Sequence, residues 1–205
     1  MNLSQLEEAL QEITELPPWG LKQADSWDKH SRLIFNCPTY ELLQKELERI
    51  NPGESLRHYI INRWYNALSA QGIELILSEC KGVIPHHNKY EKEIDFYLHK
   101  IPFDHKTTVF PKGFHQGFNH ALNHPESLVL WLYNNQSKEG RYHRGNRLFI
   151  VLHQSDGKHW QLKKELSFIA PIIKDYIKRF NPDKLIKLQL SSTHTALTDI
   201  IWVTR

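Results

Sequence analysis

Residues 93–108 read as two strands joined by a tight connection, and this segment constrains the fold more than any other. Apolar and polar side chains alternate along it, and successive side chains of a strand point to opposite faces. The apolar face comprises Ile94, Phe96, Leu98, Ile101 and Phe103, and the polar face comprises Glu93, Asp95, Tyr97, Asp104, Lys106 and Thr108. We therefore predict a hairpin with a core on one side and a polar site on the other.

The register of this hairpin depends on the length of its loop. A two-residue turn at 99–100 sets Asp95 opposite Asp104, whereas a four-residue loop at 99–102 sets Asp95 opposite Lys106. The His-Lys pair at 99–100 is not favoured turn chemistry, and the proline that follows limits the ladder, so both registers stay open. In either register two carboxylates and an ammonium converge on one face.

Length and composition describe an ordinary globular chain. At 205 residues with 40% hydrophobic residues, it can bury a core as one domain with an appendage, without disulfides. The two cysteines, Cys37 and Cys80, do not have metal-ligand spacing, which favours a reducing cytoplasm. No apolar run approaches the roughly 20 residues that cross a bilayer, so we expect no membrane partner. The acidic N-terminal residues are unlike a signal peptide. A net charge of +3 is too mild to indicate nucleic acid by itself.

Apolar periodicity and helix-breaking residues predict a mixed α/β fold. Helices are expected over 3–16, 39–50, 54–70, 125–134 and 160–180, and strands over 73–78, 93–98, 101–108, 148–152, 185–190 and 199–203. Loops are expected at 82–88 and 138–147, with a histidine-bearing connection after residue 113. We divide the chain into an N-terminal helical extension, 1–53, and a core, 54–205.

From residue 54 the expected order is helix, three strands, helix, strand, helix, strand. Together with Asp95, eight intervening residues and then Asp104-His105-Lys106, this order resembles the PD-(D/E)XK nuclease superfamily. The likeness covers roughly half to two-thirds of the chain. It implies a restriction endonuclease-like core, in which helices flank a central mixed β-sheet. Ile94 stands where the nominal motif has proline.

The resemblance also implies roles for the residues of the motif. Asp95 and Asp104 would be metal ligands, the main-chain carbonyl of His105 a third, and Lys106 would position or help to deprotonate the attacking water. The expected metal is Mg²⁺, with Mn²⁺ as a substitute, because hard carboxylate oxygens suit an ion that keeps waters for phosphate chemistry.

A further acidic residue is sometimes supplied by the first core helix of the superfamily. Glu54 is the best candidate for that role, and Glu79 and Glu93 are alternatives. The Gln-x-x-x-Tyr element of the exonuclease branch is absent, because Gln136 and Tyr142 are six positions apart. We therefore expect an endonuclease rather than an exonuclease.

Basic residues on both sides of the motif are candidates for contacts with DNA phosphates. The candidates are His87, Lys89, Arg141, Arg144 and Arg147. In a helix, His120 and His124 would share a face with the i, i+4 spacing of zinc ligands, although surface histidines of a loop are the simpler interpretation.

The leading hypothesis is thus a Mg²⁺-dependent deoxyribonuclease that hydrolyses phosphodiester bonds. The alternative is a nucleic-acid-binding or assembly module that has the same fold but no turnover. A histidine-dependent metal hydrolase of unrelated substrate ranks last. A homodimer would bring two sites to the two strands of DNA, with the N-terminal helices as candidate interface elements.

Overall fold

The structure is a computed structural model, and it describes residues 1–18, 25–88, 94–135 and 145–205. The chain divides into two compact units: Met1–Ile76 with Lys163–Ala170, and Leu77–Leu162 with Pro171–Arg205. Each unit is described by itself. The first unit extends beyond the expected boundary at residue 53, because the helix that begins at residue 54 belongs to it as far as Ile76.

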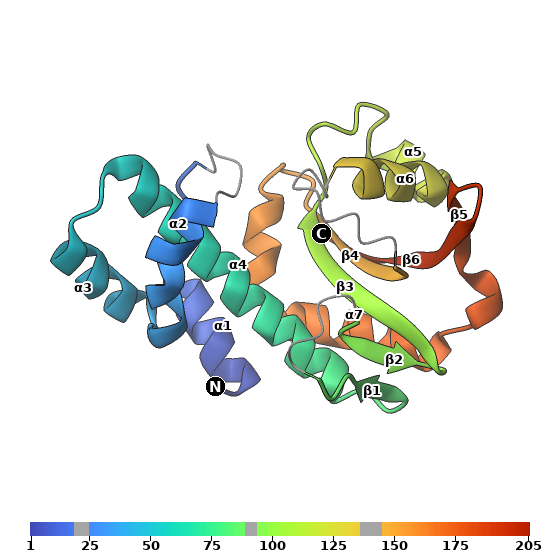
Figure 1. Cartoon of the computed structure of the whole chain (residues 1–205), viewed down its shortest axis with the longest axis horizontal. Coiled ribbons are helices and arrows are strands. Elements are labelled where there is room, and N and C mark those ends of the chain that lie inside the picture. Colours follow the sequence, from blue (N-terminus) through green and yellow to red (C-terminus); the bar gives the residue numbers. More distant parts are fainter. Residues whose placement is uncertain (19–24, 89–93, 136–144) are drawn as a thin grey trace. The chain divides into compact units, whose positions relative to one another are not determined.

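The first unit is built from helices (Figure 1). They are α1 (Leu3–Gln11), α2 (Asp25–His30), the 3-10 helix η1 (Ser31–Asn36), α3 (Tyr40–Ile50) and most of α4 (Glu54–Ser78). The prediction of a helix over 39–50 is confirmed. At the start of α3 the Thr39 side chain accepts a hydrogen bond from the Leu42 amide, and Asn51, with a φ of 43°, ends the helix. The first helix ends at Gln11, earlier than the expected residue 16.

The predicted strand at 73–78 is wrong, because α4 runs on to Ser78. Gly72 suggested an end to the helix, but here it serves close packing. A Cβ at this position would lie 2.5 Å from Leu166 Cδ1, so the missing side chain makes room for that leucine. The apolar run after Gly72 continues the helix, with Ile73 and Ile76 completely buried.

The second unit contains a six-stranded mixed sheet in the order β1-β2-β3-β4-β6-β5. The strands are β1 (Val83–Pro85), β2 (Phe96–Leu98), β3 (Ile101–Val109), β4 (Arg147–His153), β5 (Ile186–Ser191) and β6 (His194–Thr204). Strands β1, β2 and β3 are antiparallel, β4 is parallel to both β3 and β6, and β5 closes a hairpin with β6. The mixed α/β class and the buried strand after residue 147 are confirmed. The expected loop at 82–88 instead contains β1.

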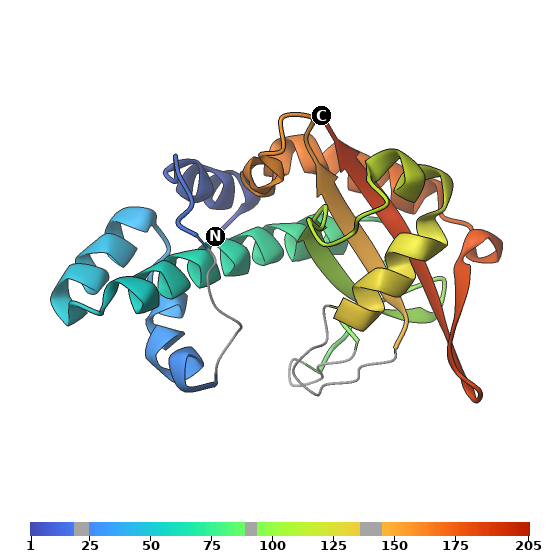
Figure 2. The ribbon, with the colours of Figure 1, turned by 90° about the horizontal axis from the view of Figure 1, so that it is seen from above.

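Helices cover both faces of this sheet in the second unit. The helices α5 (Phe118–Asn123) and α6 (Pro125–Asn135) lie over one face (Figures 1 and 2) and pack against side chains such as Phe149, Val151 and Ile200. On the other face, Phe180, directly after α7 (Leu166–Arg179), contacts Phe103.

The structure differs from the expected helices at two places in this region. Residues 118–123 form α5, where the sequence indicated only a connection. The helix expected over 160–180 is divided into η2 (His159–Lys164) and α7, which begins where the Glu165 carbonyl accepts the amides of Phe168 and Ile169. A short 3-10 turn, η3 (Pro182–Lys184), leads into β5. Within the described residues, no helix combines the length and apolar character that a membrane span requires.

Candidate active site

The turn between β2 and β3 settles the register of the hairpin. His99 and Lys100 have φ angles of 50° and 68°, as a two-residue turn with both central residues in the left-handed region requires. Leu98 consequently pairs with Ile101. The four-residue alternative is therefore wrong. The His99 ring packs edge-on against Phe180 at 5.4 Å, and this packing supports a backbone conformation that histidine rarely adopts.

Asp104 occupies the deep position of the polar face. Its side chain is only 5% exposed, and each carboxylate oxygen meets a cation. Lys106 Nζ lies 2.6 Å from Oδ1, and Arg147 Nε lies 3.3 Å from Oδ2. Lys106 follows two residues later on the same face of β3, and Arg147 pairs with Asp104 in the parallel ladder to β4. The alternation that predicted the polar face thus brings Asp104 and Lys106 together.

The sequence predicted that Arg147 lies in a loop, and this prediction is wrong. Arg147 is the first residue of β4 and is 3% exposed, with its guanidinium 4.9 Å from the centre of the Tyr133 ring on α6. The Tyr133 hydroxyl donates to the Gly145 carbonyl, which holds the ring in place. Arg147 is therefore a partner of the Asp104 carboxylate, and its burial is incompatible with the predicted contact to a DNA phosphate.

Asp95 lies just before β2, next to β3. Its amide donates to the Phe103 carbonyl, and its Oδ2 atom accepts both the backbone amide of His105 at 2.8 Å and the His105 Nδ1–H at 2.7 Å. Because an ionised carboxylate can only accept hydrogen bonds, this contact assigns the proton to Nδ1. Sequence reasoning gave only the carbonyl of His105 a role and missed its ring. No sequence signal could have identified the ring, because its bond to Asp95 depends on the backbone just before β2.

The two carboxyl groups have pKa values displaced in opposite directions. Burial raises the pKa of Asp104, and the nearby Asp95 charge adds to this effect against the opposing pull of Lys106 and Arg147. Burial also acts to raise the pKa of Asp95, but the hydrogen bonds and charge of His105 outweigh it and hold that pKa below its usual range. Adjacent acids with environments this different are typical of catalytic sites.

The oxygen donors of this site are of the kind that Mg²⁺ prefers, although the site offers few protein ligands. Among the described residues, no group of three or more His, Cys, Asp or Glu side chains is arranged to hold a metal. Mg²⁺ commonly uses one or two carboxylates and retains waters in its other positions. The amide and carbonyl of a strand residue point to the same side, so the His105 carbonyl faces the side of β3 on which its amide meets Asp95. Two carboxylates and this carbonyl give three hard oxygen donors.

The structure shows a contact or a position for two of the three candidates for a further acid. Glu54 is the first residue of α4 in the N-terminal unit, where its exposed carboxylate lies 3.9 Å from His58. Glu79 pairs with Lys174 at 3.0 Å. Glu93 lies outside the described residues.

The remaining candidates for DNA contacts are also dispersed. His87 is exposed after β1, where its ring stacks on His86. Lys89, Arg141 and Arg144 lie outside the described residues. The rings of His120 and His124 at the end of α5 lie 4.6 Å apart, as the i, i+4 spacing predicted, but they have no third ligand among the described residues.

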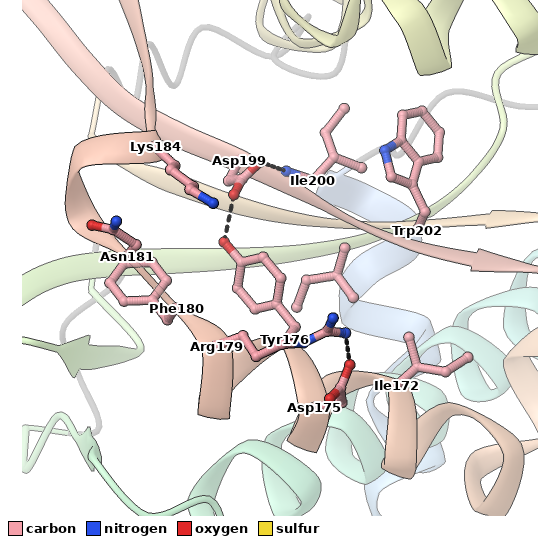
Figure 3. A pocket seen from close by; sticks show the side chains of 11 residues that line it. Ile172, Asp175, Tyr176, Arg179, Phe180, Asn181, Lys184, Asp199, Ile200 and Trp202 are labelled. Atoms are coloured by element: carbon pink, nitrogen blue, oxygen red, sulfur yellow. Dashed lines mark hydrogen bonds and ion pairs between the residues drawn. The ribbon is translucent and has the colours of Figure 1, made fainter.

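A pocket of about 380 Å³ lies between α7 and β6 and shares no lining residue with the carboxylate pair (Figure 3). Its acidic groups have partners within the pocket. Asp199 accepts the Tyr176 hydroxyl at 2.7 Å and the Ile200 amide at 2.8 Å, and Asp175 pairs with Arg179. We therefore interpret the two carboxylates of this pocket as structural.

Comparisons with known proteins identify no relative of this chain. No protein-family model, no curated protein and no solved structure matches it.

Proposed function

We propose that the chain is a Mg²⁺-dependent nuclease that hydrolyses DNA phosphodiester bonds, of the PD-(D/E)XK type. The observation that carries the proposal is the hairpin pair: Asp95 and Asp104 lie beside each other with their pKa values displaced in opposite directions, and Lys106 lies 2.6 Å from Asp104. Phosphoryl transfer needs this combination of metal-binding oxygens and a nearby cation.

The order of elements supports the same proposal. From residue 54 the chain forms a helix, three antiparallel strands, helices and then a strand parallel to the third. This agrees with the α-β-β-β-α-β order with which the superfamily core begins. Asp95 lies directly before the second strand and Asp104 lies in the third, close to where the superfamily carries its two acidic ligands.

Each residue of the site has a distinct role in the proposed reaction. Asp95, Asp104 and the His105 carbonyl would hold Mg²⁺, which supplies an acidified water and charge stabilisation at the phosphate. His105 fixes the orientation of Asp95 through two hydrogen bonds, and Arg147 fixes Asp104 from the buried side. The Lys106 ammonium, 43% exposed, can turn from Asp104 toward the attacking water or a phosphate oxygen.

The same contacts favour a second candidate, a nucleic-acid-binding or assembly module without turnover. Both oxygens of Asp104 already meet cations of the chain itself, Lys106 and Arg147. A carboxylate neutralised in this way can be a structural ion pair rather than a metal ligand. Calorimetry with Mn²⁺ separates the two: measurable affinity that the Asp104→Asn variant loses supports the nuclease, and no affinity supports the module.

Cleavage of plasmid DNA tests the proposed function directly. Supercoiled plasmid is incubated with Mg²⁺ or Mn²⁺ and either the wild-type protein or the Asp104→Asn variant, because asparagine keeps the shape and one oxygen for Arg147. We expect cleavage to fall by about 100-fold or more. The matched control is Asp199→Asn, which changes a carboxylate of the pocket in Figure 3. Equal cleavage by Asp104→Asn and the wild type would exclude this site.

The proposal includes a homodimer, since cleavage of both strands commonly uses two sites. Sedimentation of the protein alone and on DNA tests this part. A monomer under both conditions would contradict it.

A further inference from the structure

Aromatic rings lie near Asp95 on the side of β2 that pairs with β1. Strand β1 pairs with β2 through Ile84 and Tyr97, and the His86 amide donates to the Asp95 carbonyl at 2.9 Å. His86 therefore lies opposite Asp95, and the two form a row across the end of β1 and the residue before β2. Side chains in such a row share one face and are close neighbours.

Three rings follow one another beside this row, and we name them the ring ladder: His87, His86 and Tyr97. The centres of the His86 and His87 rings lie 4.9 Å apart with their planes 8° from parallel. The centres of the His86 and Tyr97 rings lie 5.7 Å apart, and the planes of these two rings differ by 26°. Tyr97 and His86 are half-buried and His87 is exposed, so the ladder rises from the sheet toward solvent.

The ring of His86 is held in place within the ladder. The Asn88 amide donates to its Nδ1 at 3.1 Å, and its ring stacks on those of His87 and Tyr97. The exposed ring of the ladder, and therefore the one available to a ligand, is that of His87. Ile84, 63% exposed next to Tyr97, adds apolar surface beside the ladder.

We propose that the ring ladder stacks on an unpaired nucleobase of the DNA strand whose phosphate lies at Asp95 and Asp104. This inference rests on the proposed function, because it takes DNA as the ligand of the neighbouring carboxylates. In a duplex the faces of a base are covered by its neighbours, whereas an unpaired base can stack on aromatic side chains. The substrate is thus DNA that is single-stranded next to the cut: a free strand, a flap or an unpaired end.

Binding of labelled oligonucleotides in EDTA isolates this interaction from cleavage. The probes are a fluorescein-labelled 12-nucleotide thymidine strand, the corresponding RNA strand and a blunt duplex, and the readout is anisotropy at fixed salt. Three variants separate stacking from a phosphate contact: His87→Ala removes the ring, His87→Trp enlarges it, and His87→Lys supplies a cation without a ring. His115→Ala, at another exposed histidine, is the control.

We expect His87→Ala and His87→Lys to weaken binding of the DNA strand by about 5-fold or more, which corresponds to one stacked base. His87→Trp should restore or tighten it, and His115→Ala should leave it unchanged. Binding of the duplex should change less than 2-fold in every variant, an estimate that follows from its covered bases.

Each other result has a definite meaning. Full affinity of His87→Lys together with weak binding of His87→Trp would show a phosphate contact and overturn stacking. An unchanged affinity of His87→Ala would overturn it as well, and tighter binding of RNA than DNA would overturn DNA as the source of the base. If the ring dependence holds while plasmid cleavage does not depend on Asp104, the ladder remains a binding site and the nuclease proposal fails.

Discussion

Two regions of the same sheet carry half-buried or buried aspartates, and they are organised differently. On β3 and the start of β2, Asp104 and Asp95 lie beside each other, with Lys106 and Arg147 as cationic partners. On β6, Asp199 accepts hydrogen bonds from two neutral donors, the Tyr176 hydroxyl and the Ile200 backbone amide. The pocket of Figure 3 lies at Asp199 and shares no lining residue with the pair.

The difference shows why a hollow alone does not mark a catalytic site. A single carboxylate with two neutral hydrogen-bond donors is stable without any ligand, because its lone pairs are occupied by the chain itself. Two adjacent carboxylates repel each other, and the environment here separates their pKa values. Two adjacent acids with displaced pKa values thus distinguish the hairpin pair from the single carboxylate at Asp199.

Replacing a lysine in each region should give the largest contrast. Lys106→Met removes the ammonium beside Asp104, and we expect cleavage of plasmid DNA to fall by about 100- to 10,000-fold, the range for a group that assists proton transfer. Lys184→Met should leave the rate within about 2-fold, because Lys184 is exposed and lines the pocket at Asp199, which shares no residue with the pair. Equal losses in both variants would remove the distinction between the two regions.

Removing Arg147 should give the largest loss of stability. The Arg147→Met variant leaves the Asp104 carboxylate buried beside Lys106 alone, and breaking a buried ion pair costs about 3–5 kcal/mol of unfolding free energy. The double variant Asp104→Leu/Arg147→Met should recover most of this loss, because neither charge then remains buried. Urea unfolding measures both. A loss below about 1 kcal/mol would show that water reaches the pair.

The hairpin could be predicted because its pattern is local. Alternation fixed which side chains share a face, and it placed Asp104 and Lys106 together before the turn was known. The turn itself could not be chosen, since its left-handed residues are His99 and Lys100 rather than asparagine or glycine. Its conformation depends on packing with Phe180, which is far away in the sequence.

The errors concern residues whose roles depend on distant contacts. Gly72 looks like the end of a helix until Leu166 is seen against it. Arg147 looks like part of a basic loop, and only the parallel pairing of β4 with β3 brings it to Asp104. The His105 ring could not be assigned because its bond to Asp95 requires the chain to leave the ladder just before β2. Periodicity carries none of this information.

Removing the hydroxyl of Tyr176 should have a smaller effect than removing Arg147. The Tyr176→Phe variant loses one hydrogen bond to Asp199, which remains bonded to the Ile200 amide. We expect unfolding free energy to fall by about 1–2 kcal/mol, the cost of a hydrogen bond to a charged group, with plasmid cleavage unchanged. If Tyr176→Phe lost more unfolding free energy than Arg147→Met, the contacts of Asp199 would contribute more to stability than those of Asp104, contrary to this prediction.

The two regions should also lose their contributions to stability at opposite ends of the pH scale. Urea unfolding of the wild type, Asp95→Asn and Tyr176→Phe is followed from acid to alkaline pH in EDTA. The pKa of Asp95 lies below its ordinary value of 3.8, so the unfolded state binds the proton first as the pH falls. The advantage of the wild type over Asp95→Asn should therefore be complete above about pH 4 and disappear as the pH falls further.

Tyr176 should behave in the opposite way. Burial and the neighbouring Asp199 charge raise the pKa of its hydroxyl above the ordinary value of 10.0, so the unfolded state loses the proton first as the pH rises. The advantage of the wild type over Tyr176→Phe should be constant at neutral pH and decline above about pH 10. The contacts described stabilise the ionised form of Asp95 and the neutral form of Tyr176. A stability difference that disappeared at the same end of the pH scale for both variants would therefore contradict these contacts.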